Sequence, residues 1–345
     1  MSAPHGEASI AVTLQRLGER CLRPLCLDFA SARENENVSL YQYFQPNGPS
    51  GFGYGSTAEQ VTEGLTLAGK TVLITGCNSG LGLEAMRVLV LRGAKVLGAA
   101  RTLDKAREAC AALGAAAVPL ACELTDPASV RACVAEVKRT GLKLDAVICN
   151  AGIMALPKLE TAHGIEMQLF TNHVGHFVLV TGLLDQLAGD GRVVVLSSGA
   201  HQMAPKEGIQ FDNLSGQKGY RPWTAYGQSK LANVLFAKEL ARRFAGTRRT
   251  ANAVHPGVVQ TNLGRHMNPI ATAVFGLVGS LVLKSIAQGA ATEVYAAVHP
   301  AVAGVSGAYF ADCNVAKCRP DAEDPALAAR LWKVTEEIVG RLPAR

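Results

Sequence analysis

From Lys70 onward, the chain alternates between short runs of apolar residues and longer segments in which apolar residues recur every three or four positions. The short runs are rich in β-branched residues, as in KTVLITG and GRVVVLSS. Short, nearly continuous apolar runs are typical of strands that are buried on both faces of a sheet. We therefore predict about seven strands, at residues 70–76, 94–101, 115–122, 144–152, 191–198, 249–257 and 307–310.

The segments between these runs predict helices. In DPASVRACVAEVKRTG, Asp126 is placed to cap the N-terminus, Pro127 suits the first helical position and Gly141 suits the end. Further helices are expected at residues 83–93, 161–188 and 224–245. Strands that alternate with helices fold into a parallel sheet that is covered on both faces. We expect one Rossmann-type, doubly wound α/β domain over residues 66–340.

Residues 1–65 do not share this alternation. They end in YQYFQPNGPSGFGYGST, which is rich in Gly, Pro and Ser. We interpret them as an N-terminal extension with one short helix and an arm.

Composition narrows the classes of function. The net charge is +6, and Lys and Arg are spread along the chain without the concentrated basic stripe that nucleic-acid binding requires. We therefore expect no nucleic-acid partner. The longest uncharged apolar run, residues 269–283, is shorter than the roughly 20 residues that span a bilayer. Contact of this run with a membrane surface stays open, which makes peripheral membrane association an alternative.

The nine cysteines are odd in number and form no CxxC motif. This usage favours buried, reduced thiols in an intracellular reducing compartment, either cytoplasmic or organellar. Cys313 and Cys318 have no His or Cys partner at zinc-finger spacing, so we expect no metal site.

A glycine-rich turn follows the first predicted strand. TGCNSGLG, residues 75–82, places three glycines where the chain passes from a strand into a helix. Glycines let the backbone approach a ligand closely, and the helix N-terminus offers N–H groups to a pyrophosphate. The spacing GxxxGxG differs from the commoner GxGxxG, and the alternative is a tight turn without a ligand. The candidate contacts are Thr75, Gly76, Asn78, Ser79, Gly80, Leu81 and Gly82.

The next two strands end in residues that bear on the choice of cofactor. Arg101 stands at the end of the second strand, where an Asp or Glu would read a ribose hydroxyl of NAD. An arginine suits a 2′-phosphate, so NADP (NADPH) is favoured over NAD, unless Arg101 is merely a surface residue. Glu123 and Leu124 follow the third strand, where Glu123 either meets the adenine edge or is exposed.

A tyrosine and a lysine lie one helical turn apart in AYGQSKLANVLFAKEL, at Tyr226 and Lys230. A neighbouring ammonium lowers the pKa of a phenol, which prepares it to exchange a proton with a carbonyl or alcohol oxygen. The alternative is a chance pair on an ordinary amphipathic helix. Ser197 and Ser198 end the fifth strand, and Asn172 lies on the helix predicted to begin near Thr161.

In this order and spacing, TGCNSGLG, NAG, TNHVGHF, LSS, YGQSK and HPG resemble the motifs of the short-chain dehydrogenase/reductase superfamily. The resemblance covers about residues 50–340. STAEQVTEGLTLAGK, NAVHPGVVQTNL, QGAATEVY and GAYFADC are similar to the retinol dehydrogenase group. That group includes the WW-domain-containing oxidoreductases and the plant short-chain dehydrogenases associated with the chloroplast import translocon. No WW domain is visible in this sequence.

The resemblance implies a role for each matching residue. Tyr226 is the general acid/base, and Lys230 binds the nicotinamide ribose and lowers the pKa of the tyrosine. Ser198 positions the substrate oxygen, and Asn172 holds a proton-relay water. The other implied cofactor contacts are Asn150, Ala151 and Gly152 beside the adenosine ribose, and Pro256, Gly257, Val259 and Thr261 near the nicotinamide.

The sequence departs from the family's pattern at two places. Glu123 stands where the family usually has Asp, and the glycine turn lacks a basic residue. A substrate lid is expected near residues 262–289, with a buried helix as the alternative. We expect His173, His176 and His255 to be structural or solvent-facing.

The expected function is an NADP(H)-dependent oxidoreductase that interconverts an alcohol and a carbonyl of a lipophilic, retinoid-like substrate. The alternatives are a nucleotide-binding regulatory or scaffold subunit, and a double-bond reductase of the protochlorophyllide reductase type. The chain is expected to be a monomer, or a homodimer that pairs the helices around residues 161–188 and 224–245.

Overall fold

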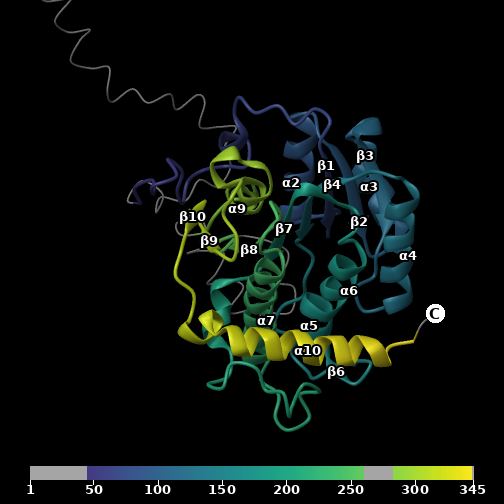
Figure 1. The fold of residues 1–345 in the computed structure, drawn as a ribbon, viewed down its shortest axis with the longest axis vertical. Coiled ribbons are helices and arrows are strands. Elements are labelled where there is room, and N and C mark those ends of the chain that lie inside the picture. The colour runs from purple at the N-terminus through teal and green to yellow at the C-terminus, as the bar shows by residue number, and fades with distance from the viewer. Residues whose placement is uncertain (1–44, 260–282, 344–345) are drawn as a thin grey trace, which may run out of the picture. The chain divides into compact units, whose positions relative to one another are not determined.

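The computed structural model describes residues 45–259 and 283–343. Their main feature is an eight-stranded sheet with the strand order β10-β9-β8-β7-β4-β1-β2-β3 (Figure 1). All neighbours pair in parallel except β10, which pairs antiparallel with β9. The strands are β1 (Thr71–Thr75), β2 (Lys95–Ala100), β3 (Ala117–Ala121), β4 (Leu144–Cys149), β7 (Leu187–Leu196), β8 (Thr250–His255), β9 (Tyr309–Ala311) and β10 (Asn314–Val315). This confirms the predicted doubly wound α/β class, with the short β10 as an addition.

Helices cover both faces of the sheet. One hydrophobic core contains residues of α4, α6, α7 and α10, and the other contains residues of α2, α3 and α9. Leu73 faces the first core, whereas its neighbours Val72 and Ile74 face the second, as the alternation of side chains along a strand requires. The helices are α2 (Gly80–Leu91), α3 (Leu103–Ala111), α4 (Pro127–Arg139), α6 (Gly175–Gly182), α7 (Pro222–Arg243), α9 (Ile286–Val298) and α10 (Pro325–Arg341).

The strand order reverses at β1. β1 pairs with β2 on one side and with β4 on the other. From β1 the chain continues to β2 and β3 toward one edge of the sheet, and from β4 it continues to β7 and β8 toward the other edge. Ligands of open α/β sheets bind at the carboxyl ends of the strands beside such a switch point. The fold therefore places the candidate site at the ends of β1 and β4.

The prediction of a helix from Thr161 is wrong. Residues Thr161–Ala162 (β5) and Ile165–Glu166 (β6) form a small hairpin, with left-handed φ angles of 51° at His163 and 78° at Gly164. The helix begins with α5 (Met167–Leu169), and the Glu166 carboxylate caps it by accepting from Leu169 N at 2.8 Å. A π-helical turn, Phe170–Val174, then leads into α6.

The C-terminal helix α10 packs against α7 within the same chain (Figure 1). Its Trp332 ring lies 4.7 Å from that of Phe177 on α6 and 5.8 Å from that of Phe236 on α7. The Arg243 guanidinium lies 3.9 Å from the centre of the Trp332 ring. Phe177 and Phe236 are therefore covered by α10.

The described part of the N-terminal segment also packs on the domain. Ala58 and Val61 are buried in the core that contains α2 and α9, and Ala58 N donates to Ala287 O at 2.9 Å. None of the helices in the described ranges is long and apolar enough to cross a membrane.

Candidate active site

The glycine turn joins β1 to α2 at the switch point. Gly76 and Gly80 have left-handed φ angles of 72° and 55°, which glycine adopts without strain. A Cβ on Gly82 would lie 2.4 Å from both the Gly76 oxygen and Asn150 Nδ2. Asn150 Nδ2 also donates to the oxygen of Thr75 at 2.8 Å. The turn is therefore packed tightly on the end of β4, and Gly82 leaves no room for a side chain.

The N-terminus of α2 fits the pyrophosphate of a dinucleotide. Ser79 is the N-cap residue in an extended conformation, and its side chain makes no capping hydrogen bond. Asn78 and Ser79 are exposed, and the first turn carries no acidic residue. The first N–H groups of an α-helix have no partner within the helix, and their partial positive charge favours an anion.

Thr75 is buried beneath this turn. Its hydroxyl accepts from Ala151 N at 3.0 Å and bonds to His176 Nε2 at 2.9 Å, while His176 Nδ1 bonds to Asn172 O at 3.0 Å. Burial lowers the pKa of His176 to about 4, so this imidazole is neutral at pH 7. His176 is therefore structural, as expected, and it connects the end of β1 to the π-helical turn.

Tyr226 and Lys230 lie on the first turns of α7, as the spacing predicts, and both side chains are buried. Lys230 Nζ is 5.6 Å from the centre of the Tyr226 ring and donates to Leu196 O at 3.0 Å. Ser198 follows β7, and its side chain hydrogen-bonds with that of Tyr226. The structure thus brings a phenol, a hydroxyl and an ammonium together at the end of β7.

The predicted lowering of the Tyr226 pKa is wrong for this structure. Burial raises the pKa of Tyr226 to about 12, and the hydrogen bond with Ser198 opposes this only in part. The Lys230 ammonium is directed to Leu196 O, and burial lowers its own pKa to about 8. At neutral pH the phenol therefore keeps its proton.

Asn172 lies in the π-helical turn, a feature that is frequent at functional sites. Its Nδ2 donates to Ile153 O at 3.0 Å and to Ser229 Oγ at 2.9 Å, and its Oδ1 accepts from Ile153 N at 2.8 Å. A Cβ on Gly152 would lie 3.0 Å from Asn172 Oδ1 and 3.5 Å from Lys230 Nζ. Asn172, Gly152 and Lys230 therefore border the same small space.

The predicted contacts after β2 and β3 differ in accessibility. Arg101 is exposed directly after β2, and Thr102 beside it caps α3. Glu123 is half-buried, and its Oε1 accepts from the backbone N–H and the hydroxyl of Thr125 at 3.0 and 2.8 Å. Leu124 is buried in the core. Arg101 is thus accessible to a ligand, whereas the carboxylate of Glu123 already accepts hydrogen bonds from Thr125 in the turn after β3.

The turn after β8 contains Pro256 and Gly257, which has a φ of 87°. Val259 forms an isolated bridge with Lys284, so the chain returns to this turn after residues 260–282. Thr261 and residues 262–282 of the expected lid lie outside the described residues. The end of that segment is described, and Ser285 there opens α9 with a capping box.

An ion pair beside this turn, between the buried Lys284 and the partly exposed Asp312, was not predicted from the sequence. Lys284 is 1% exposed, and its Nζ lies 2.5 Å from Asp312 Oδ1 and 4.8 Å from the centre of the Tyr54 ring. A Cβ on Gly257 would lie 2.7 Å from Lys284 Cδ. A lone lysine after a long apolar run is the only signal in the sequence, and it does not identify Asp312 as the partner.

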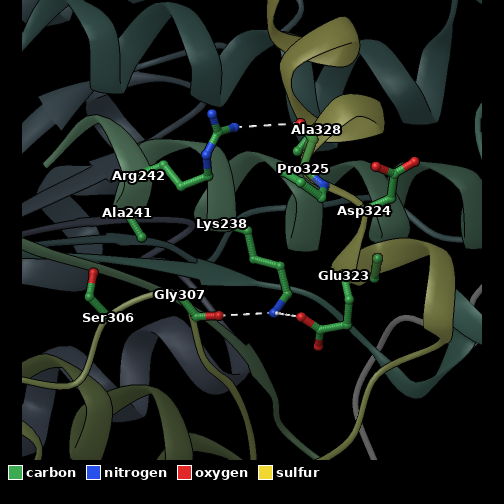
Figure 2. Close-up of a pocket in the computed structure, with 10 residues that line it drawn as sticks. Lys238, Ala241, Arg242, Ser306, Gly307, Glu323, Asp324, Pro325 and Ala328 are labelled. Carbon is green, nitrogen blue, oxygen red and sulfur yellow. Dashed lines mark hydrogen bonds and ion pairs between the residues drawn. The ribbon is translucent and has the colours of Figure 1, made fainter. Parts of the chain in front are cut away.

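A surface pocket of about 280 Å³ lies near the C-terminal part of α7 (Figure 2). Lys238 in this pocket donates to Gly307 O at 3.0 Å and to Glu323 Oε2 at 2.8 Å. Lys238 is twelve residues after Tyr226, which corresponds to about 18 Å along the helix. This pocket is therefore separate from the candidate active site.

The doubly wound sheet, the glycine turn at its switch point and the Tyr226–Lys230 pair define a nucleotide-dependent oxidoreductase. The short chain dehydrogenase family matches residues 70–212. Short-chain dehydrogenase TIC 32 B, chloroplastic, from Brassica napus is 41% identical over 310 residues, which cover 86% of this chain and 97% of the relative. Retinol dehydrogenase 14 from Mus musculus is 41% identical over 293 residues, with coverage of 79% and 87%.

An uncharacterized protein from Mycobacterium Paratuberculosis has a similar crystal structure, with a TM-score of 0.67 and 34% identity over 82% of this chain and 98% of that chain. The chain belongs to the short-chain dehydrogenase/reductase family, and the resemblance to the retinol dehydrogenase group is confirmed. The protein is an NAD(P)-dependent dehydrogenase that acts on CH–OH groups.

Proposed function

We propose that the protein interconverts an alcohol and a carbonyl of a lipophilic substrate with NADP(H), and that Tyr226 exchanges the proton. The observation that carries this proposal is the placement of Tyr226, Ser198 and Lys230 at the end of β7, which β4 separates from the strand that leads into the glycine turn. The bound nicotinamide cofactor supplies or accepts the hydride.

The residues of the chain supply position and the proton. In the reduction direction, the phenol of Tyr226 protonates the substrate oxygen while the Ser198 hydroxyl holds it. One of the three donors of Lys230 is directed to Leu196 O, and we assign the others to the hydroxyls of the nicotinamide ribose. Asn172 keeps the π-helical turn against Gly152 and thereby maintains the space next to Lys230.

The pKa of Tyr226 predicts how activity depends on pH. A phenol with a pKa of about 12 is protonated at neutral pH, which favours reduction of a carbonyl. Oxidation of an alcohol needs the phenolate and is therefore expected to accelerate as pH rises toward 10.

The direct test is Tyr226→Phe, assayed with a panel of alcohols and carbonyls through nicotinamide absorbance. We expect a loss of turnover of at least about 100-fold with little change in nucleotide affinity. Tyr295→Phe is the matched control, because it removes a phenol hydroxyl from a buried tyrosine on α9. Unchanged turnover in Tyr226→Phe would exclude the assignment. A wild-type protein that binds nucleotide without any turnover would instead favour the regulatory or scaffold alternative.

The preference for NADP is proposed from Arg101. This side chain is exposed at the carboxyl end of β2, where a 2′-phosphate would be read. Arg101→Ala should raise the KM for NADPH by roughly 10-fold or more and leave the KM for NADH nearly unchanged. Arg107→Ala, an exposed arginine on α3, is the control. A proportional change with both nucleotides would contradict this role.

A lipophilic substrate is supported by the apolar side chains beside Tyr226. Trp223 is 42% exposed, and its ring lies edge-on to that of Tyr226 at 6.2 Å. Met203 is 44% exposed and adjoins Gly227, because a Cβ on this glycine would lie 2.7 Å from the backbone of Met203. Relatives named retinol dehydrogenase agree with this class of substrate. Contact with a membrane surface stays a prediction for the apolar run at residues 269–283, of which residues 269–282 lie outside the described part.

We propose that the protein is a monomer, and that the helices around residues 161–188 and 224–245 do not pair with those of a second copy. Phe177 of α6 and Phe236 of α7 are covered by Trp332 of α10 rather than left for a second copy. Size-exclusion chromatography with light scattering checks this, and the monomer mass of 36.2 kDa is the expected result. A stable dimer that disappears on substitution of exposed α7 residues would contradict it.

A further inference from the structure

The turns that follow β7 and β8 share one hydrogen-bond acceptor. Nδ1 of His255 accepts from the backbone N–H of Gly199 at 3.2 Å and from that of Gly257 at 3.3 Å. Gly199 comes directly after Ser198, and Gly257 comes directly after Pro256. One imidazole nitrogen therefore connects the Ser198 turn to the turn assigned to the nicotinamide.

These two donors define the protonation state of the imidazole. A ring nitrogen accepts only through its lone pair, so Nδ1 carries no hydrogen and the proton of the neutral ring is on Nε2. Burial lowers the pKa of His255 to about 4. Among the charged groups that face the ring, Asp312 raises this pKa, whereas Lys284, His201 and Lys230 lower it. The ring is therefore neutral throughout the range in which a dehydrogenase is assayed.

The ring also packs against the Ser198 turn. A Cβ on Gly199 would lie 3.4 Å from His255 Nε2, which is the distance of an ordinary van der Waals contact. The turn is further held by its own hydrogen bonds, since the Ser198 hydroxyl accepts from Ala200 N at 3.2 Å. Moving His255 would therefore move the backbone on which Ser198 stands.

We propose that His255 is a positioning residue, which holds the Ser198 turn and the Gly257 turn at a constant separation through the shared Nδ1 acceptor. This proposal rests on the proposed function, because the substrate oxygen is held by the first turn and the nicotinamide by the second. Hydride transfer requires the reacting atoms within about 3–3.5 Å, and a misplacement of about 1 Å costs on the order of 100-fold in rate. His255 acts on this distance without contacting the reacting atoms.

The test is a matched pair of amide variants. In His255→Asn, the side-chain oxygen reaches the position of Nδ1 and still accepts from both N–H groups. In His255→Gln, the oxygen lies one bond further out, near the position of Nε2. We expect kcat of the Asn variant to stay within about 3-fold of wild type and kcat of the Gln variant to fall by about 10-fold or more. The KM for the nucleotide should change less than kcat.

A second readout does not depend on turnover. In protein labelled with ¹⁵N-glycine, the amide resonances of Gly199 and Gly257 report their hydrogen bonds. Both should move in His255→Gln and stay near their wild-type positions in His255→Asn. Unmoved resonances in the Gln variant would refute the shared acceptor.

The remaining outcomes separate this inference from the proposed function. Equal kcat in the two variants, with the amides displaced only in the Gln variant, would reduce His255 to a structural contact and overturn the positioning role. Absence of turnover in wild type would refute the proposed function, whereas the amide shifts would still decide whether the acceptor is shared. If the Gln variant does not fold, a loss of kcat above about 10-fold in the folded Asn variant overturns the proposal.

Discussion

Glu293 is a buried carboxyl on α9, and it predicts how the stability of the protein depends on pH. The residue is 1% exposed. Neither carboxyl oxygen has a hydrogen-bond partner within the part of the chain that the structure describes. Burial raises the pKa of Glu293 from 4.5 to about 8. Its proton is therefore retained in the folded state at pH values where the unfolded chain has released it.

The sign of the effect follows from proton uptake on folding. Between pH 4.5 and about 8 the folded state binds one proton more than the unfolded state at this position, so the free energy of unfolding falls as pH rises. The full slope is about 1.4 kcal/mol per pH unit. Between pH 5 and pH 8 this corresponds to a loss on the order of 4 kcal/mol.

The perturbation that removes this linkage is Glu293→Gln, which keeps the shape of the side chain and cannot ionise. We expect the variant to match wild type at pH 5 and to be more stable than wild type at pH 8, by on the order of 4 kcal/mol. The assay is urea unfolding of both proteins at pH 5, 6.5 and 8. Glu63→Gln, at an exposed position, is the control and should follow wild type at each pH.

The pH dependence of the difference between the two proteins decides the outcome. A difference in unfolding free energy that is the same at pH 5 and pH 8 would refute the reasoning, because it would show that Glu293 has the same protonation state in the folded and unfolded chain. A variant that is less stable at pH 8 would show that the ionised carboxylate has a stabilising partner.

Two further predictions concern the turns of the site. Gly82→Ala should abolish nucleotide binding, measured by quenching of tryptophan fluorescence, because its Cβ would lie 2.4 Å from the Gly76 oxygen and displace the turn. Gly304→Ala, where a Cβ meets nothing within 4 Å, should bind like wild type. Asp312→Asn should destabilise the protein by about 1–2 kcal/mol in urea unfolding, because it leaves the buried Lys284 ammonium without a counter-charge that water already screens in part. A change below about 0.5 kcal/mol would show that the pair does not stabilise the fold.

Much of the fold and part of the site follow from local patterns. Apolar runs of strand length that alternate with helical segments lead to a parallel sheet, because parallel strands need a long crossover connection, which is usually a helix. The glycine turn and the Tyr226–Lys230 pair are equally local. Three glycines after a strand define a tight turn into a helix, and residues four apart on a helix share a face.

The sequence by itself therefore determined the class of fold, the position of the glycine turn and the pairing of the tyrosine with the lysine. Only the tertiary structure decided the rest, because the rest depends on contacts between distant segments. The pKa of Tyr226 rises because other elements bury the phenol, and the ammonium of Lys230, one helical turn away, does not offset the effect of that burial on the pKa. Lys284 meets Asp312, and His255 joins the turns after β7 and β8, because the sheet brings chain ends together that no spacing along the sequence relates.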